Sequence, residues 1–164
     1  WFNYGNCQAQ LKKTGEAAPD IATAVVRELV GSPSFAHWFE RPVGEFPIAV
    51  LGAEHSSMIG ARGQVAVFSP ATHAKQAINH PELVAADYAR VQDVISQGTA
   101  YQDSDVSLVF VLDEAAGMTS VVKATQSGNG LFLTSLRHLP TDPVERAAEI
   151  RRIERKAARY AGSK

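Results

Sequence analysis

The chain has 164 residues, of which 45% are hydrophobic and 20% are charged, and its formal net charge is −1. This composition suits one domain that buries roughly 70% of its unfolded surface, and the near-neutral charge argues against indiscriminate coating of nucleic acid. A single cysteine, Cys7, excludes an internal disulfide, and no apolar run approaches the ~20 residues of a membrane-spanning helix. Because no signal-peptide pattern is present, we expect a cytoplasmic protein that does not enter a membrane.

Charge is distributed unevenly along the chain. Between Glu82 and Glu114, seven carboxylates accompany one basic residue, Arg90, whereas seven of the sixteen lysines and arginines lie from Arg146 onward. Residues 1–18 show no lasting hydrophobic period, which indicates an N-terminal arm or the tail of a preceding module. We expect residues 19–164 to form a single domain.

Helical and strand patterns alternate in the first part of this domain. Helical spacing of apolar residues, capping residues and short β-branched runs between turn residues define the elements. In order, the predictions are a helix from Asp20 to Gly31, a short helix over SPSFAHWF, strands over 46–51 and 64–69, and helical segments over 71–80 and 81–98, which Pro81 separates.

The second part reads as an antiparallel meander followed by a helix. Three strand-like runs, 106–112, 118–125 and 131–138, are joined by loops of about five residues. Asp142, with proline next and glutamate three residues along, predicts the start of a charged helix that reaches about Tyr160. The order of elements predicts an α+β fold, with N-terminal helices packed on a roughly four-stranded antiparallel sheet and a C-terminal charged helix.

The hairpin KATQSGNGLFLTSLR, from Lys123 to Arg137, suggests a binding site. A three-residue turn over 128–130 sets a register in which Lys123 lies opposite Ser135. Because alternate residues share a face, Thr125 and Arg137 then fall on the same side. Two cations and two hydroxyls converge there without a carboxylate among them, which suits an RNA phosphodiester.

Other interpretations of the hairpin stay open. A four-residue turn would place Lys123 opposite Thr134, and an ordinary solvated hairpin carries similar residues. In the three-residue register, two leucines also fall on the basic face. These are Leu131 and Leu133, while Val122, Ala124, Phe132 and Leu136 form the opposite, core-like face.

Nothing in the sequence indicates a metal or a cofactor. HExxH, paired-cysteine, P-loop and GxSxG patterns are all absent. His73 and His80 lie seven residues apart, so they can share a helix face, and either can carry a proton near neutral pH. The alternative for both is a capping or packing role. The basic residues of the last helix fit either a solvated face or RNA contact.

The order of these pieces is similar to that of a known family. The run SPSFAHWFERPVGEFPIAVL, then VAVFSPATHAKQAINHPEL, a tyrosine-containing helix, LVFVL and VVKATQSGNGLFLTSLR, resembles the phage-type nucleases grouped with barnase, EndoU, colicin-type anticodon nucleases and RelE toxins. Such domains often form the C-terminal part of phage head-morphogenesis proteins like the Mu F protein. The resemblance covers roughly residues 32–138, and KQ..HPEL and V.KAT.SG..LF.TS.R are its most specific parts.

The resemblance implies a sheet whose open face is the active site, and metal-independent cleavage of RNA by attack of the ribose 2′-hydroxyl on the adjacent phosphate. At matching positions, the two hairpin cations hold the phosphate, the two hydroxyls position it, and the histidine of the HPE element transfers a proton. The implied catalytic residues are His80, Lys123, Thr125, Ser135 and Arg137, with His73 and Lys75 as RNA-binding residues.

The resemblance also implies partners and leaves two alternative functions. A toxin of this kind would cut RNA, with tRNA as the candidate, in a bacterial cytoplasm and would have an immunity or antitoxin protein. A catalytically silent relative would instead bind phage capsid or scaffold proteins through apolar surface on its helices. An ADP-ribosyltransferase would need a catalytic glutamate on a strand, whereas we expect Glu114 in a turn.

Overall fold

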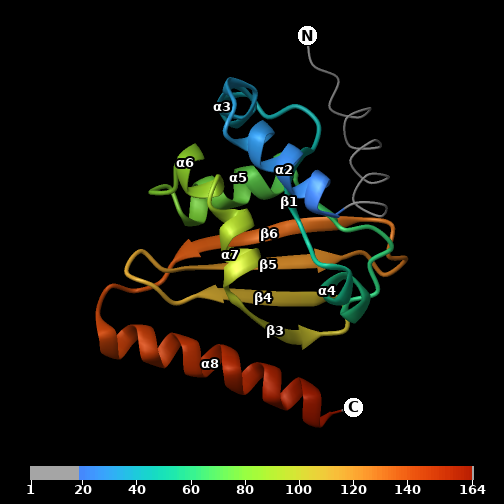
Figure 1. The fold of residues 1–164 in the computed structure, drawn as a ribbon. Coiled ribbons are helices and arrows are strands. Elements are labelled where there is room, and N and C mark those ends of the chain that lie inside the picture. Colours follow the sequence, from blue (N-terminus) through green and yellow to red (C-terminus); the bar gives the residue numbers. More distant parts are fainter. Residues whose placement is uncertain (1–18, 164) are drawn as a thin grey trace.

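The computed structural model describes residues 19–163, which form helices around one six-stranded sheet (Figure 1). The expected N-terminal arm, residues 1–18, lies outside the described residues. The strand order is β1-β2-β6-β5-β4-β3, and every neighbouring pair is antiparallel except β2 and β6. The predicted α+β class is confirmed, with six strands in the sheet in place of about four.

Seven helices and six strands are described between residues 19 and 163. The helices are α2 (Pro19–Val30), α3 (Pro33–Glu40), α4 (Ala53–Met58), α5 (Pro70–Asn79), α6 (Ala85–Tyr88), α7 (Val91–Gln97) and α8 (Pro143–Gly162). The strands are β1 (Phe46–Val50), β2 (Val65–Phe68), β3 (Thr99–Ser104), β4 (Ser107–Leu112), β5 (Met118–Ala124) and β6 (Leu131–His138).

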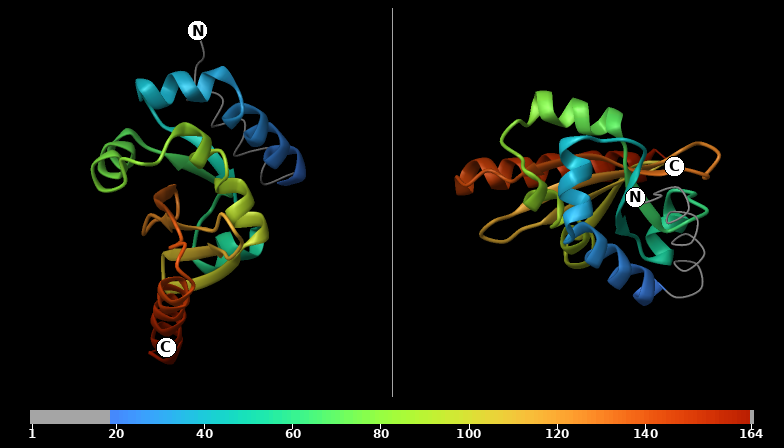
Figure 2. Two further views of the ribbon diagram at one scale, coloured as in Figure 1. Left: turned by 90° about the vertical axis from the view of Figure 1, so that its left-hand side faces the viewer. Right: turned by 90° about the horizontal axis from the view of Figure 1, so that it is seen from above.

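The two faces of the sheet are covered differently (Figure 2). Helices α2, α3 and α7 pack on one face, the helix-covered face, where the main core includes Trp38, Phe110 and Leu136. The other face, the open face, carries Thr119, Val121 and other alternate residues of β5, and α8 crosses it along β3. A second, smaller cluster joins α8 to this face; its members are Val109, Val111, Leu139 and Ile153, with Tyr101, Val121 and Ile150 packed against it.

Helix α5 lies along the part of β6 that extends past the short strand β2. Only Val67 and Phe132 pair these two strands, so the later carbonyl groups of β6 have no strand partner on that side. Lys75 Nζ donates to the carbonyl oxygen of Thr134 at 2.7 Å, and Gln76 Nε2 donates to that of Leu136 at 2.7 Å. The side chains of α5 therefore satisfy an exposed strand edge.

Helix α8 begins, and helix α2 ends, where the sequence predicted. The carboxylate of Asp142 accepts a hydrogen bond from the Glu145 amide at 2.9 Å, and Pro143 opens α8. Helix α2 ends at Val30, immediately before the predicted stop. The apolar spacing of Ile21, Val25 and Leu29 predicted this helix, but its buried positions lie one residue along, so the period was right and the face was not; they are Ala22, Val26 and Val30.

Other elements differ from the predictions. The helix expected over 81–98 is two short helices, because the chain turns between Tyr88 and Val91, and residues 81–84 are not helical. Helix α4 and strand β3 were not predicted; β3 has the polar sequence TAYQDS and lies at an edge of the sheet, where strands need little apolar character. Within residues 19–163, no helix is long and apolar enough to cross a bilayer.

The hairpin register expected from the sequence is wrong. Lys123 pairs with Phe132, not with Ser135 or Thr134, because the loop closes between Thr125 and Gly130. The Gly130 amide donates to the side-chain oxygen of Thr125 at 2.9 Å as well, and this bond stabilises the observed loop. Leu131 and Leu133 consequently face the core, and Phe132 lies on the open face.

A bulge at Thr134 restores the predicted face further along β6. Val122 pairs with Leu133, whereas the preceding Val121 pairs with Ser135, so Thr134 is an extra residue. After this bulge, Arg137 pairs with Thr119. Ser135 and Arg137 therefore do share the open face with Lys123, as expected, although the pairing that brings them there differs.

Candidate functional site

A pocket of about 470 Å³ lies on the open face between the end of α5 and α8. Its floor comes from β4, β5 and β6, and α8 forms one wall. We call it the basic pocket, because four of its residues are arginine or lysine; the full lining is His80, Asp103, Val109, Thr119, Val121, Ser135, Arg137, Arg152, Ile153, Lys156 and Arg159.

Arg137 projects from β6 into this pocket and is held in place from two sides. Its Nε donates to the hydroxyl of Thr119 at 3.3 Å, and its guanidinium forms an ion pair with Glu149 of α8. The guanidinium has five N–H donors in a planar fork, so these two partners leave donors that can reach into the pocket. Arg137 thus has the position and the remaining donors to bind an anion.

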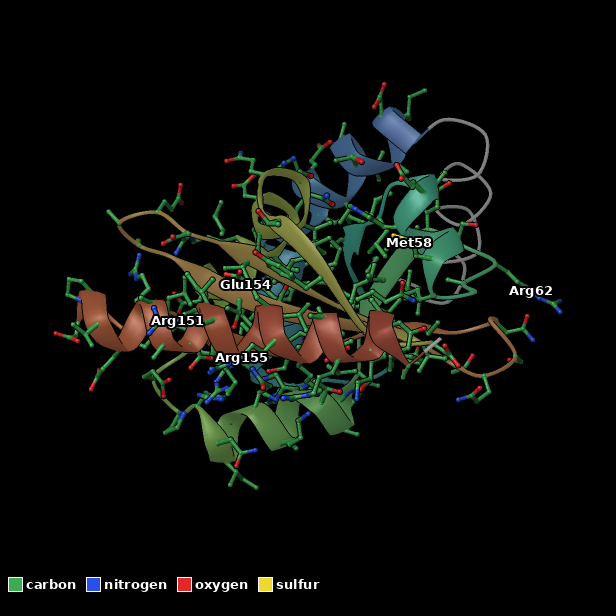
Figure 3. All side chains as sticks on the ribbon, turned by 90° about the horizontal axis from the view of Figure 1, so that it is seen from below. Met58, Arg62, Arg151, Glu154 and Arg155 are labelled. Carbon is green, nitrogen blue, oxygen red and sulfur yellow. The ribbon has the colours of Figure 1, made fainter. Side chains whose placement is uncertain are left out.

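Helix α8 supplies three cations at helical spacing. Arg152, Lys156 and Arg159 follow one another by four and three residues, so they share one side of the helix. Arg152 pairs with Glu149 at 2.9 Å, and Lys156 pairs with Asp103 at 3.2 Å. Figure 3 shows two further arginines of this helix, Arg151 and Arg155, so the whole of α8 is strongly basic.

The charges around the pocket do not cancel. Four cations line it, against the two carboxylates of Asp103 and Glu149, which leaves a charge of about +2 (four minus two) with the histidine neutral. Charges of one sign that line a cleft raise the local concentration of oppositely charged ligands. The arrangement favours a dianionic or polyanionic ligand.

Helix α8 is anchored firmly enough to form a wall. Arg146 Nε donates to the Pro140 carbonyl oxygen at 2.8 Å, and its Nη1 donates to that of Glu114. Further along, Ile150 and Ile153 pack on the open face, and the Tyr160 hydroxyl donates to Asp105. The cations of α8 are therefore fixed over the sheet by contacts at both ends of the helix.

His80 lies at the rim of the basic pocket and is the one histidine among its lining residues. It caps the end of α5, and its amide donates to the Gln76 carbonyl oxygen at 2.7 Å. Its Nδ1 lies 3.4 Å from a carboxylate oxygen of Glu82, and about 30% of the side chain is exposed. The ring therefore borders both the pocket and solvent.

Two of the five expected catalytic residues lie outside the pocket. Lys123 is exposed on the open face, four residues along β5 from Thr119, the partner of Arg137. Thr125 closes the hairpin turn, where its hydroxyl contacts Ser127 and Gly130. The structure thus brings His80, Ser135 and Arg137 together and leaves Lys123 and Thr125 apart from them.

The two expected RNA-binding residues have different environments. His73 packs against Trp38, Phe39 and Phe68 with ring centroids 4.6–5.7 Å apart, and its Nε2 is buried without a hydrogen bond. This histidine therefore belongs to the core of the helix-covered side. Lys75 is exposed next to β6 and can face a ligand on the open face.

Sequence reasoning missed Thr119 and Asp103, and it left RNA contact by the basic residues of α8 as one of two alternatives. The helix carried a usable signal, since its basic residues at 152, 156 and 159 repeat at helical spacing. Nothing in the sequence showed that this side would face the sheet. Within residues 19–163, no group of three or more His, Asp, Glu or Cys side chains is arranged to hold a metal ion.

Two tyrosines have perturbed protonation. Burial raises the pKa of the Tyr88 hydroxyl above its ordinary value of 10.0, and a hydrogen bond from Gln76 partly opposes this rise. Burial also raises the pKa of Tyr101, with a further contribution from the charge of Glu154. Both phenols are therefore neutral at physiological pH, and neither lines the basic pocket.

Comparison with known proteins does not add to this description: no protein-family model, no curated protein and no solved structure matches the chain.

Proposed function

We propose that the protein is a metal-independent ribonuclease that holds an RNA phosphodiester in the basic pocket. The observation that carries this proposal is the meeting of four cations and one histidine around a pocket of about 470 Å³. Cations neutralise the phosphoryl oxygens, and a histidine titrates near neutral pH, so both requirements of phosphodiester cleavage are present. The resemblance of the sequence to phage-type nucleases supports the same chemistry.

The proposed reaction is an internal transfer at phosphorus. The ribose 2′-oxygen attacks the adjacent phosphate and loses its proton to a base, while the bond to the 5′-oxygen breaks and that oxygen gains a proton. The products are a 2′,3′-cyclic phosphate and a free 5′-hydroxyl. Negative charge on the phosphoryl oxygens increases in the transition state, which cations fixed in advance stabilise.

The residues divide these tasks by position. Arg137 and the cations of α8 surround the phosphate, and the hydroxyls of Thr119 and Ser135 lie on the pocket floor beside it. His80 at the rim carries a proton to or from the reacting oxygens. General acid–base catalysis of this kind contributes about 10²–10⁴ in rate.

The test is cleavage of a labelled RNA by the full chain in buffer with EDTA, with analysis of the new ends. We expect cyclic phosphate ends, and no cutting of a matched RNA with a single 2′-deoxy residue at the cleaved position. Arg137→Ala should lower the rate by about 100-fold or more, because it removes a transition-state contact. Intact RNA over a range of pH and salt would refute the proposal.

Arg27→Ala is the matched control for Arg137→Ala. Arg27 is also a partly exposed arginine in an ion pair, with Asp93 at 2.7 Å, but it lies on α2. Its removal should leave the cleavage rate within about twofold, as expected for a surface substitution away from the site. Equal losses in the two variants would show that net charge, not the pocket, determines the activity.

One observation favours a second candidate, a phage assembly module that binds other proteins. Several apolar side chains on or beside the helices are exposed, namely Ile21, Val25, Ile78, Val84 and Val144. Ile78→Ser should then weaken binding to purified capsid or scaffold protein, with RNA cleavage unchanged. If Arg137→Ala abolished that binding and Ile78→Ser did not, this candidate would be excluded.

A further inference from the structure

Three cations follow β6 across the open face of the sheet. Arg137 lies at one end of the strand, Lys75 contacts the carbonyl oxygen of Thr134 in the middle, and Lys123 lies opposite Phe132 near the other end. Arg137 is paired with a carboxylate. Among residues 19–163, neither lysine forms an ion pair with a carboxylate. The row therefore extends positive charge from the basic pocket toward the β5–β6 hairpin.

The two ends of this row are too far apart to bind one phosphate. Lys123 is four residues from Thr119, the partner of Arg137, which corresponds to about 13 Å along the strand. A single phosphate group contacts ligands at hydrogen-bond distance, roughly 3 Å from each oxygen. Because Thr119 and Glu149 also hold Arg137 at its own end of the strand, Lys123 is placed to bind a different phosphate from the one at Arg137.

Phe132 gives the Lys123 end an apolar surface. Its ring is partly exposed on the open face, opposite Lys123 and next to Val67 of β2. The ring lies against Gly130, where an added Cβ would come within 2.7 Å of a ring carbon. Glycine at this position thus lets the ring pack against the hairpin backbone, which holds an aromatic side chain beside Lys123.

We propose that Lys123 and Phe132 form a second binding position, the hairpin subsite, for the same single-stranded RNA that the basic pocket cleaves. A base stacks on Phe132, and the phosphate next to it contacts Lys123. Base stacking on an aromatic ring beside a basic track is the usual means of binding single-stranded nucleic acid without strong sequence preference. This inference rests on the proposed ribonuclease function, and it adds that the substrate extends beyond the cleaved dinucleotide.

The neighbouring charges permit such a strand. Asp103 lies near the Lys123 end of this path, since it accepts a hydrogen bond from Ser107, the cross-strand neighbour of Lys123. Lys156 Nζ forms an ion pair with the Asp103 carboxylate at 3.2 Å, and the side chain of Asp103 is only about 10% exposed. A duplex would keep its bases stacked on one another, so it cannot place a base on Phe132. The geometry therefore selects unpaired RNA.

The test compares binding of two 2′-O-methyl oligonucleotides, a dinucleotide and a hexanucleotide, which this chemistry cannot cut. Fluorescence anisotropy with the full chain should show tighter binding of the hexanucleotide. Phe132→Leu and Lys123→Ala should each weaken hexanucleotide binding by about tenfold, and change dinucleotide binding by less than about twofold. Phe132→Trp should retain the affinity, and Arg27→Ala should change neither.

The outcomes separate this inference from the function on which it rests. If both lengths bind equally, if the two variants weaken both lengths equally, or if a blunt duplex binds as tightly as the hexanucleotide, the hairpin subsite is refuted. The basic pocket is tested independently, because Arg137→Ala should weaken the dinucleotide. If neither length binds to the wild-type chain, both proposals fail together.

Discussion

The same strands contribute to two faces of the sheet, and these faces have different roles. On the helix-covered face, Leu136 and Val122 are fully buried in a core that continues through Trp38 and Phe110. On the open face, the adjacent residues Arg137 and Lys123 carry charge and reach solvent. Alternation along each strand therefore separates the residues that stabilise the fold from those available to a ligand.

Substitutions on the two faces of the sheet should have different effects. Loss of volume on the helix-covered face leaves a cavity in a close-packed interior, whereas loss of a side chain on the open face leaves solvent in its place. Changes on the open face should then alter binding and catalysis with little change in the free energy of unfolding. The predictions below test that separation, beginning with the largest effect.

The largest expected effect is the loss of cleavage rate on substitution of His80, compared with substitution of His138. Each has a ring nitrogen 3.4 Å from a carboxylate oxygen, His80 from Glu82 and His138 from Asp87, but only His80 lines the basic pocket. We expect His80→Ala to reduce the rate of RNA cleavage by about 10²–10⁴ and to flatten its pH profile near neutrality. The pH dependence of kcat/KM for both variants is the measurement.

His138→Ala is the matched control for that change, and it should keep the wild-type rate and pH profile. Thermal unfolding of both variants checks that the fold is retained. Equal activity in the two variants would remove His80 from the mechanism, and loss in both would point to the stability of this end of the sheet.

The second prediction compares neighbours on one strand. Leu136 is fully buried on the helix-covered face, and Ser135 is partly exposed on the open face. Leu136→Ala should lower the free energy of unfolding by about 2–5 kcal/mol, and Ser135→Ala should lower it by less than about 1 kcal/mol. Urea titration measures both; similar losses would show that the open face is also part of the core.

These neighbours also show what sequence alone can predict. The class of fold, the last helix with its Asp142 cap and the shared face of Ser135 and Arg137 within β6 follow from local patterns. The pairing register does not, since the loop closes between Thr125 and Gly130 and not between the residues that the glycines suggested, and the bulge at Thr134 offsets this change. The shifted loop and the bulge change the register in opposite directions, and neither is marked by a recognisable pattern in the sequence.

The candidate site depends even more on contacts between distant residues. Its α8 wall faces the sheet because Ile150 and Ile153 pack on β3 and β4, and a helix with six basic residues gives only a faint apolar side in the sequence. The missed strand β3 is the element against which this helix packs most. Without β3, no prediction could place the cations of α8 beside Arg137.

The third prediction concerns Glu149, which pairs with both Arg137 and Arg152 across the edge of the pocket. A carboxylate there competes with a bound anion for the same guanidinium groups. Glu149→Gln should raise the affinity for the hexanucleotide by about two- to fivefold, the scale of a partly exposed ion pair. Glu154→Gln removes the same charge from the same helix and should have a smaller effect; equal gains would indicate net charge alone.

The smallest expected effect is on the pH dependence of the unfolding free energy, and it compares one tyrosine from each side of the sheet. Tyr88 stacks on Phe68 in the main core, and Tyr101 packs under α8. Burial raises both pKa values above 10.0, so the neutral phenols favour the folded state. This contribution is complete below pH 10 and is lost as pH rises through the raised folded-state pKa values, because the unfolded chain ionises first. Unfolding free energy should therefore fall above pH 10.

Tyr88→Phe should reduce that fall more than Tyr101→Phe, since Tyr88 is almost fully buried and Tyr101 is not. Urea titrations from pH 8 to 11 measure the slopes, and a larger change for Tyr101→Phe would show that α8 shields its face more completely than the helices shield theirs.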